Sequence, residues 1–99
     1  MRVLAIVAAL LAAGPAVSQV MVYRADKDVL RLYNQPCPVQ VHQHLTPPLD
    51  AYKAALATVG GQPFVGCWRP TSFGAVHLTY EDGDQGLIPV QAFKAEPGA

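Results

Sequence analysis

The sequence predicts a small α+β domain: a mostly antiparallel sheet with one helix packed on a face, held by one disulfide. Segments rich in β-branched and aromatic residues, separated by turn residues, predict an N-terminal hairpin and three C-terminal strands. Between them lies one segment whose apolar residues recur at intervals of three and four, which predicts a helix. The chain has two cysteines, which supply the disulfide.

Residues 1–18 have the layout of a secretory signal peptide. Arg2 precedes an unbroken apolar run over residues 3–13, and a glycine, a proline and small residues follow. A helix of this run would rise about 16 Å, whereas a membrane core is about 30 Å thick. We therefore expect a cleaved leader rather than a membrane-spanning helix.

We expect cleavage after Ser18; cleavage after Ala16 and an uncleaved anchor are the alternatives. Residues 19–99 suffice for one small domain, and the tail 94–99, which contains a proline and a glycine, is expected to be loose. An exported chain works in an oxidising space, so the expected location is periplasmic or secreted.

The charge balance excludes some partners. The chain has seven basic and seven acidic residues, with no basic stripe and no cationic amphipathic segment. We therefore expect no nucleic acid and, after leader cleavage, no membrane as partner. An envelope protein or a cell-wall component of unknown identity is the expected partner, and no cofactor is expected.

Cys37 and Cys67 are expected to form the disulfide, because export favours oxidation of a lone cysteine pair. Closing this loop stabilises a chain by about 3.7 kcal/mol in the chain-entropy model. The alternative is a zinc site of these cysteines with His42 and His44, which would need reduced thiolates outside the cytoplasm.

The predicted N-terminal hairpin comprises residues 19–24 and 28–33, joined by a polar turn. Residues 39–46 alternate valine with polar residues, which is typical of a short edge strand or an ordered loop. The C-terminal strands are expected at 63–69, 75–80 and 87–90. A proline in the last of these cannot donate to a ladder, so that strand is expected at a sheet edge.

The helix is expected over residues 47–59. Thr46 can cap it and Pro47 can occupy its first position, where the missing N–H costs nothing. Gly60-Gly61 would end it. The apolar residues recur at spacings of three, four and three: Leu49, Tyr52, Leu56 and Val59.

Trp68 follows Cys67 directly, so on a strand the two side chains point to opposite faces. If the cysteine points into the core, an exposed Trp68 with Arg69, Phe73 and Tyr80 would form a binding patch, because aromatic residues and arginine dominate interface energies. The alternative is a second small core or a partly buried tryptophan.

Two further groups of residues could bind ions. His42 and His44 would point the same way on a strand, and His77 could add a third metal ligand; a solvated edge is the alternative. The acidic turn suits a weak calcium site or a contact for a basic partner, although it lacks the spacing of an EF-hand loop and Asp-Gly is typical of a hairpin turn. Its carboxylates belong to Glu81, Asp82 and Asp84.

Catalysis has little support in the sequence, and we expect no catalytic residues. Beyond the leader the only serine is Ser72, beside a turn, and both cysteines are assigned to the disulfide. The acidic turn offers no apolar pocket that would raise the pKa of a carboxyl.

Several short motifs resemble a family of small, uncharacterised exported proteins of proteobacteria and their prophages. The resemblance implies an exported, disulfide-linked α+β domain of phage or prophage origin, with no activity to carry over. The chain is also similar, at the level of class, to periplasmic lysozyme inhibitors; these are usually all-β barrels, from which a helix over 47–59 departs. The motifs are Pro36-Cys37, Cys67-Trp68, Asp82-Gly83-Asp84, Pro89 and Phe93.

Together these features favour an exported, non-enzymatic binding or accessory protein of the cell envelope, of the inhibitor or immunity type. One alternative is a phage-encoded structural or envelope accessory protein whose exposed edge strand pairs with a partner. The other is a metal-binding module through His42 and His44.

Overall fold

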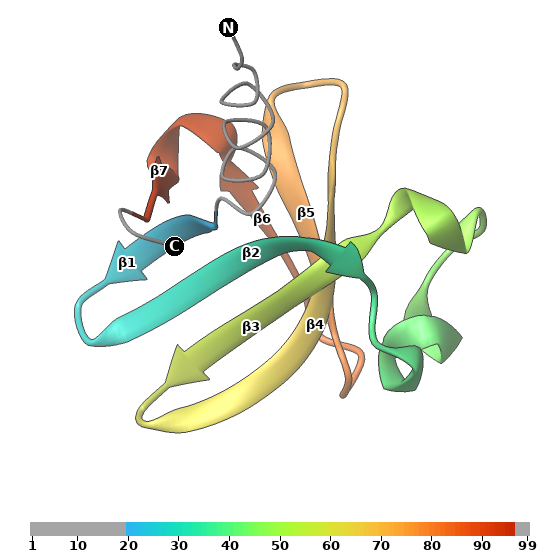
Figure 1. Cartoon of the computed structure of the whole chain (residues 1–99), viewed down its shortest axis with the longest axis horizontal. Coiled ribbons are helices and arrows are strands. Elements are labelled where there is room, and N and C mark those ends of the chain that lie inside the picture. Colours follow the sequence, from blue (N-terminus) through green and yellow to red (C-terminus); the bar gives the residue numbers. More distant parts are fainter. Residues whose placement is uncertain (1–19, 97–99) are drawn as a thin grey trace, which may run out of the picture.

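The computed structural model describes residues 20–96 and shows a single sheet of seven strands that curls on itself (Figure 1). The strand order is β6-β5-β4-β3-β2-β1-β7, and all neighbours are antiparallel. The strands are β1 (Met21–Ala25), β2 (Asp28–Pro36), β3 (Lys53–Val59), β4 (Gln62–Pro70), β5 (Ala75–Tyr80), β6 (Gln85–Pro89) and β7 (Lys94–Ala95); the 3-10 turns are η1 (Val39–His44), η2 (Leu49–Ala51) and η3 (Val90–Ala92).

The predicted α+β class is wrong: within residues 20–96 the only helical segments are the three 3-10 turns, and the structure is β throughout. The segment 47–59, predicted as one helix, begins with a cis Pro47–Pro48 bond, continues through η2 and then forms β3. β3 lies between β2 and β4 in the middle of the sheet.

The helical spacing of the apolar residues in this segment arises by chance, because these residues belong to two different elements. Leu49 and Tyr52 belong to the 3-10 turn and its end, whereas Leu56 and Val59 belong to the strand. Alanine has the highest helix propensity, but pairing with a strand on each side outweighs that preference. Gly60-Gly61 is a hairpin turn: both residues have positive φ, 59° and 81°, as a type I′ turn requires.

The remaining strand predictions are confirmed. β1 and β2 form the predicted hairpin, and β4, β5 and β6 are the three C-terminal strands. β6, which contains Pro89, lies at an edge of the sheet. Residues 39–46 form an ordered 3-10 loop rather than an edge strand. 

The structure tests the prediction for the C-terminal tail but not the one for the N-terminal leader. The predicted leader, 1–18, lies outside the described residues. In the predicted loose tail, β7 pairs with β1 through Met21↔Ala95 and Val22↔Lys94, so the tail is ordered at least to Glu96, which donates from its amide to Val20 O at 2.8 Å.

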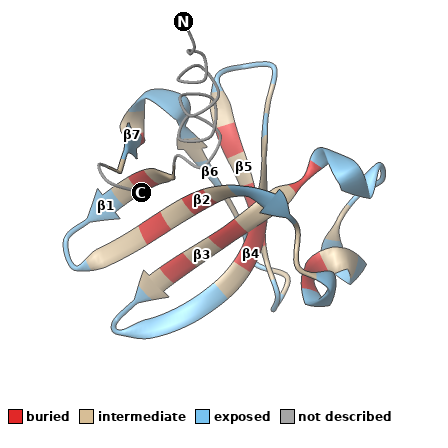
Figure 2. Ribbon diagram, viewed as in Figure 1, coloured by how far each residue is buried: buried red, intermediate tan, exposed pale blue. Residues whose placement is uncertain are grey.

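Buried residues lie along the middle strands of the sheet and within η1 (Figure 2). The concave face holds the main core, in which small alanines of β3 lie opposite leucines of β2. A smaller core lies on the convex face, where η1 and the end of η2 cover the middle of the sheet. The main core comprises Leu30, Leu32, Ala55, Ala57, Val76, Leu78 and Phe93; the smaller core comprises Val41, Tyr52 and Cys67.

The predicted disulfide is present between Cys37, which follows β2, and Cys67 of β4, with a Cα–Cα distance of 5.4 Å. It spans β3 and ties η1 to the convex face. Such a bond is compatible with an extracellular or periplasmic location. Over residues 20–96, no helix has the length and apolar character needed to cross a membrane.

Candidate functional site

The main candidate site is a cleft at one end of the curled sheet, which we call the mouth cleft. It consists of two adjoining cavities of about 340 and 180 Å³ that share Ala57, Val59 and Tyr80. The β1–β2 and β3–β4 hairpins lie on one side, and the β5–β6 turn lies on the other. Its other lining residues are Tyr23, Ala25, Asp28, Val29, Leu30, Phe64, Asp82, Asp84, Gln85 and Ile88.

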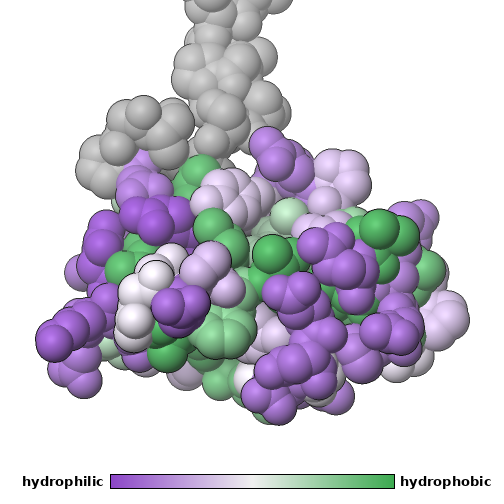
Figure 3. Space-filling view, turned by 90° about the horizontal axis from the view of Figure 1, so that it is seen from below, coloured by the Kyte–Doolittle hydropathy of each residue, from purple (hydrophilic) through white to green (hydrophobic). Residues whose placement is uncertain are grey.

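The floor of the mouth cleft is apolar and partly open to solvent. Val59 and Phe64, on the paired strands β3 and β4, are 46% and 36% exposed. The β3–β4 hairpin extends past the end of β5, whose last paired residue, Tyr80, faces Gly66. No strand of the sheet therefore covers the side of β4 that would neighbour Phe64. Figure 3 shows hydrophobic surface between hydrophilic groups on this face.

Tyr80 forms one wall, and Gly66 makes its position possible. A Cβ on Gly66 would lie 2.8 Å from Tyr80 Cδ1 and 2.8 Å from the carbonyl oxygen of Thr79. The absence of a side chain at this position lets the aromatic ring lie directly over β4. Burial raises the pKa of Tyr80 above its ordinary value, and the carboxylate of Asp82 raises it further, so the ring enters the cleft as a neutral phenol.

The rim of the mouth cleft is acidic. Asp82 and Asp84 lie in the β5–β6 turn, and Asp28 begins β2. Asp82 accepts a hydrogen bond on Oδ1 from the amide of Asp84 at 3.0 Å, and Asp28 accepts one on Oδ1 from the amide of Gly60 at 3.1 Å. These bonds hold two carboxylates toward the cleft, and none of its lining residues is basic.

The β5–β6 turn is a tight hairpin turn, as its Asp-Gly sequence predicts. Gly83 has φ 93° and donates from its amide to Tyr80 O at 2.9 Å. His44 of η1 supports the turn from the convex side: its Nε2 lies 3.1 Å from Glu81 O, and its ring packs against Gly83. The carboxylates of Asp82 and Asp84 therefore belong to a turn that is held in place by hydrogen bonds and by packing against His44.

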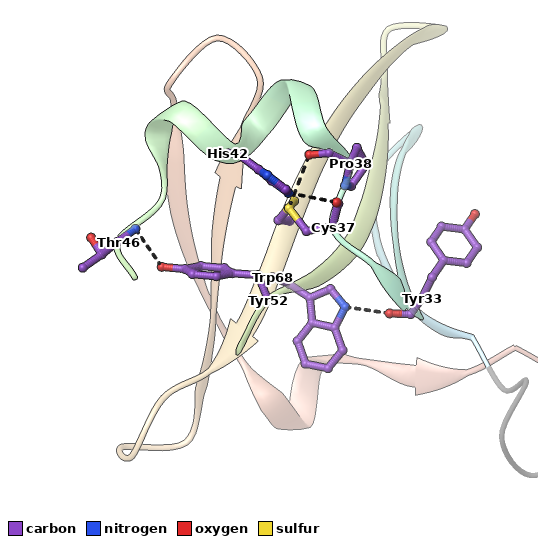
Figure 4. Close-up of a disulfide and its surroundings, with 8 residues drawn as sticks. Tyr33, Cys37, Pro38, His42, Thr46, Tyr52 and Trp68 are labelled. Atoms are coloured by element: carbon purple, nitrogen blue, oxygen red, sulfur yellow. Dashed lines mark hydrogen bonds between the residues drawn. A yellow bond between two sulfur atoms is a disulfide. The ribbon is translucent and has the colours of Figure 1, made fainter. Parts of the chain in front are cut away.

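The predicted binding patch around Trp68 does not assemble. Trp68 lies on the concave face against the main core, where its Nε1 donates to Tyr33 O at 3.0 Å (Figure 4). Arg69 points to the other face and stacks over the Tyr52 ring at 5.1 Å. Phe73, 69% exposed, lies in the β4–β5 loop at the opposite end of β5 from Tyr80.

Cys67 and Trp68 do point to opposite faces, but each face has its own core there. Cys67 is fully buried in the smaller core, next to the disulfide partner and Tyr52 (Figure 4). The side chain of Tyr52 in turn receives a hydrogen bond on its hydroxyl from the amide of Thr46 at 3.4 Å. Trp68 is thus partly buried against the main core, as the alternative of a partly buried tryptophan describes.

The three histidines serve separate structural contacts. His42 bonds through Nε2 to Cys37 O at 3.2 Å, and His77 bonds to Gln85 Oε1 at 2.8 Å, whereas the third braces the acidic turn. Within the described part of the chain, no group of three or more histidine, cysteine, aspartate or glutamate residues could hold a metal ion. The predicted zinc and calcium sites therefore lack a ligand set there.

Of the residues that the sequence singled out, Tyr80, Asp82 and Asp84 come together in the mouth cleft, while Glu81 does not line it. Val59 and Phe64 are not among the residues that the sequence singled out as a site, because a predicted helix up to Gly60 hides the strand alternation that they share. Strand alternation through a Gly-Gly hairpin would have placed both on one face.

Comparisons with known protein families, with curated proteins and with solved structures find no match to this chain, so the case for its function depends on the geometry of the site.

Proposed function

We propose that this chain is an exported, non-enzymatic binding protein of the cell envelope, of the inhibitor or immunity type, which holds its partner at the mouth cleft. The observation that carries the proposal is the open apolar floor between Val59, Phe64 and Tyr80. Apolar surface in a concave site gains free energy when a partner removes it from water.

The chemistry of the lining supports binding rather than catalysis. The described lining residues are apolar side chains, two tyrosines, a glutamine and three aspartates, without histidine, cysteine, serine or lysine. A serine or cysteine nucleophile paired with a histidine base is therefore missing from the described lining. The signal-peptide layout and the disulfide support work outside the cytoplasm.

The likeness to periplasmic lysozyme inhibitors is compatible with this proposal. The one departure from that class was the expected helix over 47–59, and this segment forms a strand instead. The likeness extends to the class of fold and to export, and it suggests inhibition as the mode of action.

The proposal is tested by capture from envelope extracts with matched variants. Phe64→Ser removes an exposed ring from the floor, and Phe73→Ser removes an exposed ring from the opposite end of the molecule. We expect one partner to be retained by the unchanged protein and by Phe73→Ser but lost with Phe64→Ser, at equal thermal stability of all three. Equal retention by both variants, or loss only with Phe73→Ser, would place binding elsewhere and refute the proposal.

A structural role at the free edge of β6 is the second candidate. Leu87 lies on this edge and Val90 lies beside it, and their side chains are 57% and 47% exposed. Phe73 is close to them in the fold, because the next residue, Gly74, accepts a hydrogen bond on its carbonyl from the Val90 amide at 3.0 Å. The edge is short and contains Pro89, which limits strand pairing. Concentration-dependent assembly that Leu87→Lys abolishes would support this role, and a strict monomer would exclude it.

A further inference from the structure

We infer that the occupant of the mouth cleft is a basic segment of a partner protein: an apolar side chain enters the cleft, and an adjacent lysine or arginine meets the acidic rim. This inference rests on the proposed function and names the class of its partner. It combines two independent features of the site, the exposed apolar floor and the sign of the surrounding charge.

The floor of the mouth cleft is large enough to receive an apolar side chain of a partner. The two cavities, of about 340 and 180 Å³, meet along Ala57 and Val59, so together they form one continuous depression. The alanine contributes depth because its methyl group leaves the space that a larger residue would fill. An extended peptide that presents one apolar side chain can enter such a depression.

The charge of the rim selects the neighbouring residue. Asp82 and Asp84 border the larger cavity and Asp28 borders the smaller one, while neither cavity has a lysine, arginine or histidine in its lining. An anionic group at this position would meet three like charges. A lysine or arginine beside the apolar anchor would instead meet complementary charge, which favours correct encounter and register.

The rim is also pre-organised. The amide of Asp84 holds the Asp82 carboxylate, and the hairpin turn is closed by hydrogen bonds from Gly83 to Tyr80 O and from Tyr80 to Asp84 O at 2.9 and 2.8 Å. A partner therefore orders few groups when it binds, which lowers the entropic cost of association.

The test uses the exported, disulfide-bonded protein, labelled with ¹⁵N, and three capped dipeptides: acetyl-Phe-Lys-amide, acetyl-Phe-Gln-amide and acetyl-Phe-Glu-amide. Binding is measured from amide chemical shifts. We expect the lysine peptide to shift the amides of Val59, Phe64 and Tyr80 and to bind more tightly than the glutamate peptide, by about twofold to fivefold for each carboxylate it meets. High salt should weaken only this preference.

Two matched variants locate the preference. Asp84→Asn removes a charge from the lining, and Glu81→Gln removes the same charge from the same turn outside the lining. We expect Asp84→Asn, and more strongly Asp82→Asn with Asp84→Asn, to reduce the preference for lysine without changing the affinity for the glutamine peptide. Glu81→Gln should leave the preference intact.

The outcomes separate the inference from the proposed function. Equal binding of all three peptides at the mouth cleft would refute the inference and leave the proposed site standing, as would a preference for glutamate. Shifts confined to the β6 edge, or no shift with any peptide, would refute both. A simple amphiphilic amine that binds far more tightly than the lysine peptide would indicate a small cation in place of a protein segment.

Discussion

At the scale of single residues, Gly66 is the described glycine at which an added side chain would clash most closely with its neighbours. The space that a side chain would occupy is taken by the Tyr80 ring and by the backbone oxygen of Thr79. Each lies 2.8 Å from the position of a Cβ atom on Gly66. The ring can turn aside, but the backbone oxygen is fixed by pairing of β4 with β5. The absence of a side chain at Gly66 therefore permits the position of the Tyr80 ring in the wall of the mouth cleft.

Gly66→Ala should therefore lower the free energy of unfolding by about 1–3 kcal/mol, the usual cost of overpacking. The matched control is Gly86→Ala in β6, where a Cβ would meet nothing within 4 Å. Urea unfolding of both variants measures the difference. Similar midpoints for the two variants would contradict the contact between Gly66 and the Tyr80 ring.

Trp68 shows where residue-level prediction stopped. Alternation along a strand correctly placed it opposite Cys67, but alternation does not say which faces are covered. The 3-10 turn η1, distant from Cys67 in sequence, covers that residue on the convex face, whereas Trp68 packs against the main core on the concave face. Only a non-local contact could reveal this.

At the scale of elements, β3 is the segment whose sequence predicts a helix although it forms a strand. Its alanines favour a helix, yet Ala55 and Ala57 are 3% and 5% exposed on the concave face, where they make room for Leu30 and Leu32 on β2. Small residues on a central strand let the sheet curl tightly around larger neighbours. The choice between helix and strand was thus made by the partners on each side.

β7 is the shortest strand of the sheet, and Glu96, the residue after it, bonds to β2 and to Val20. The Arg31 guanidinium on β2 donates from Nε and Nη2 to the two carboxylate oxygens of Glu96, at 3.1 and 3.1 Å. These hydrogen bonds hold the pKa of Glu96 below the ordinary value of 4.5, while Arg24 lies farther away at 3.9 Å.

A carboxyl whose pKa is lowered by folding stabilises the folded state above its unfolded pKa, and this contribution is lost as the pH falls through the folded pKa. We expect the pairing of β7 with β1 to weaken in that range, below pH 4.5. Hydrogen exchange at the Glu96 amide, which donates to Val20 O, reports the change. Glu96→Gln should remove the pH dependence and Arg24→Gln should largely keep it; an unchanged profile in Glu96→Gln would exclude this pair as the cause.

At the scale of the whole molecule, the disulfide crosses the sheet and fastens η1 over the smaller core. Reducing it should lower the free energy of unfolding by about 3.7 kcal/mol, the loop-closure value for this separation. Urea unfolding with and without reductant measures the loss. If the midpoints coincide, η1 is held by packing of Val41 and Tyr52 alone.

Export is tested on the full-length chain in a Gram-negative host. We expect a periplasmic species that begins at Gln19 and gains two hydrogens on reduction, as seen by intact mass. A full-length species in the membrane fraction would mean that the leader is retained as an anchor, and a species that is already reduced would contradict the oxidising location.

The sequence by itself determined the strand pairs β1–β2, β4–β5 and β5–β6, the edge position of β6 and the pairing of Cys37 with Cys67. These follow from local chemistry: turn residues, a proline without an N–H, and the only two thiols. The strand character of residues 53–59, the second core and the mouth cleft were decided by the tertiary structure. Each depends on segments distant in sequence that cover or leave open a face of the sheet, and alternation along one strand carries no information about its cover.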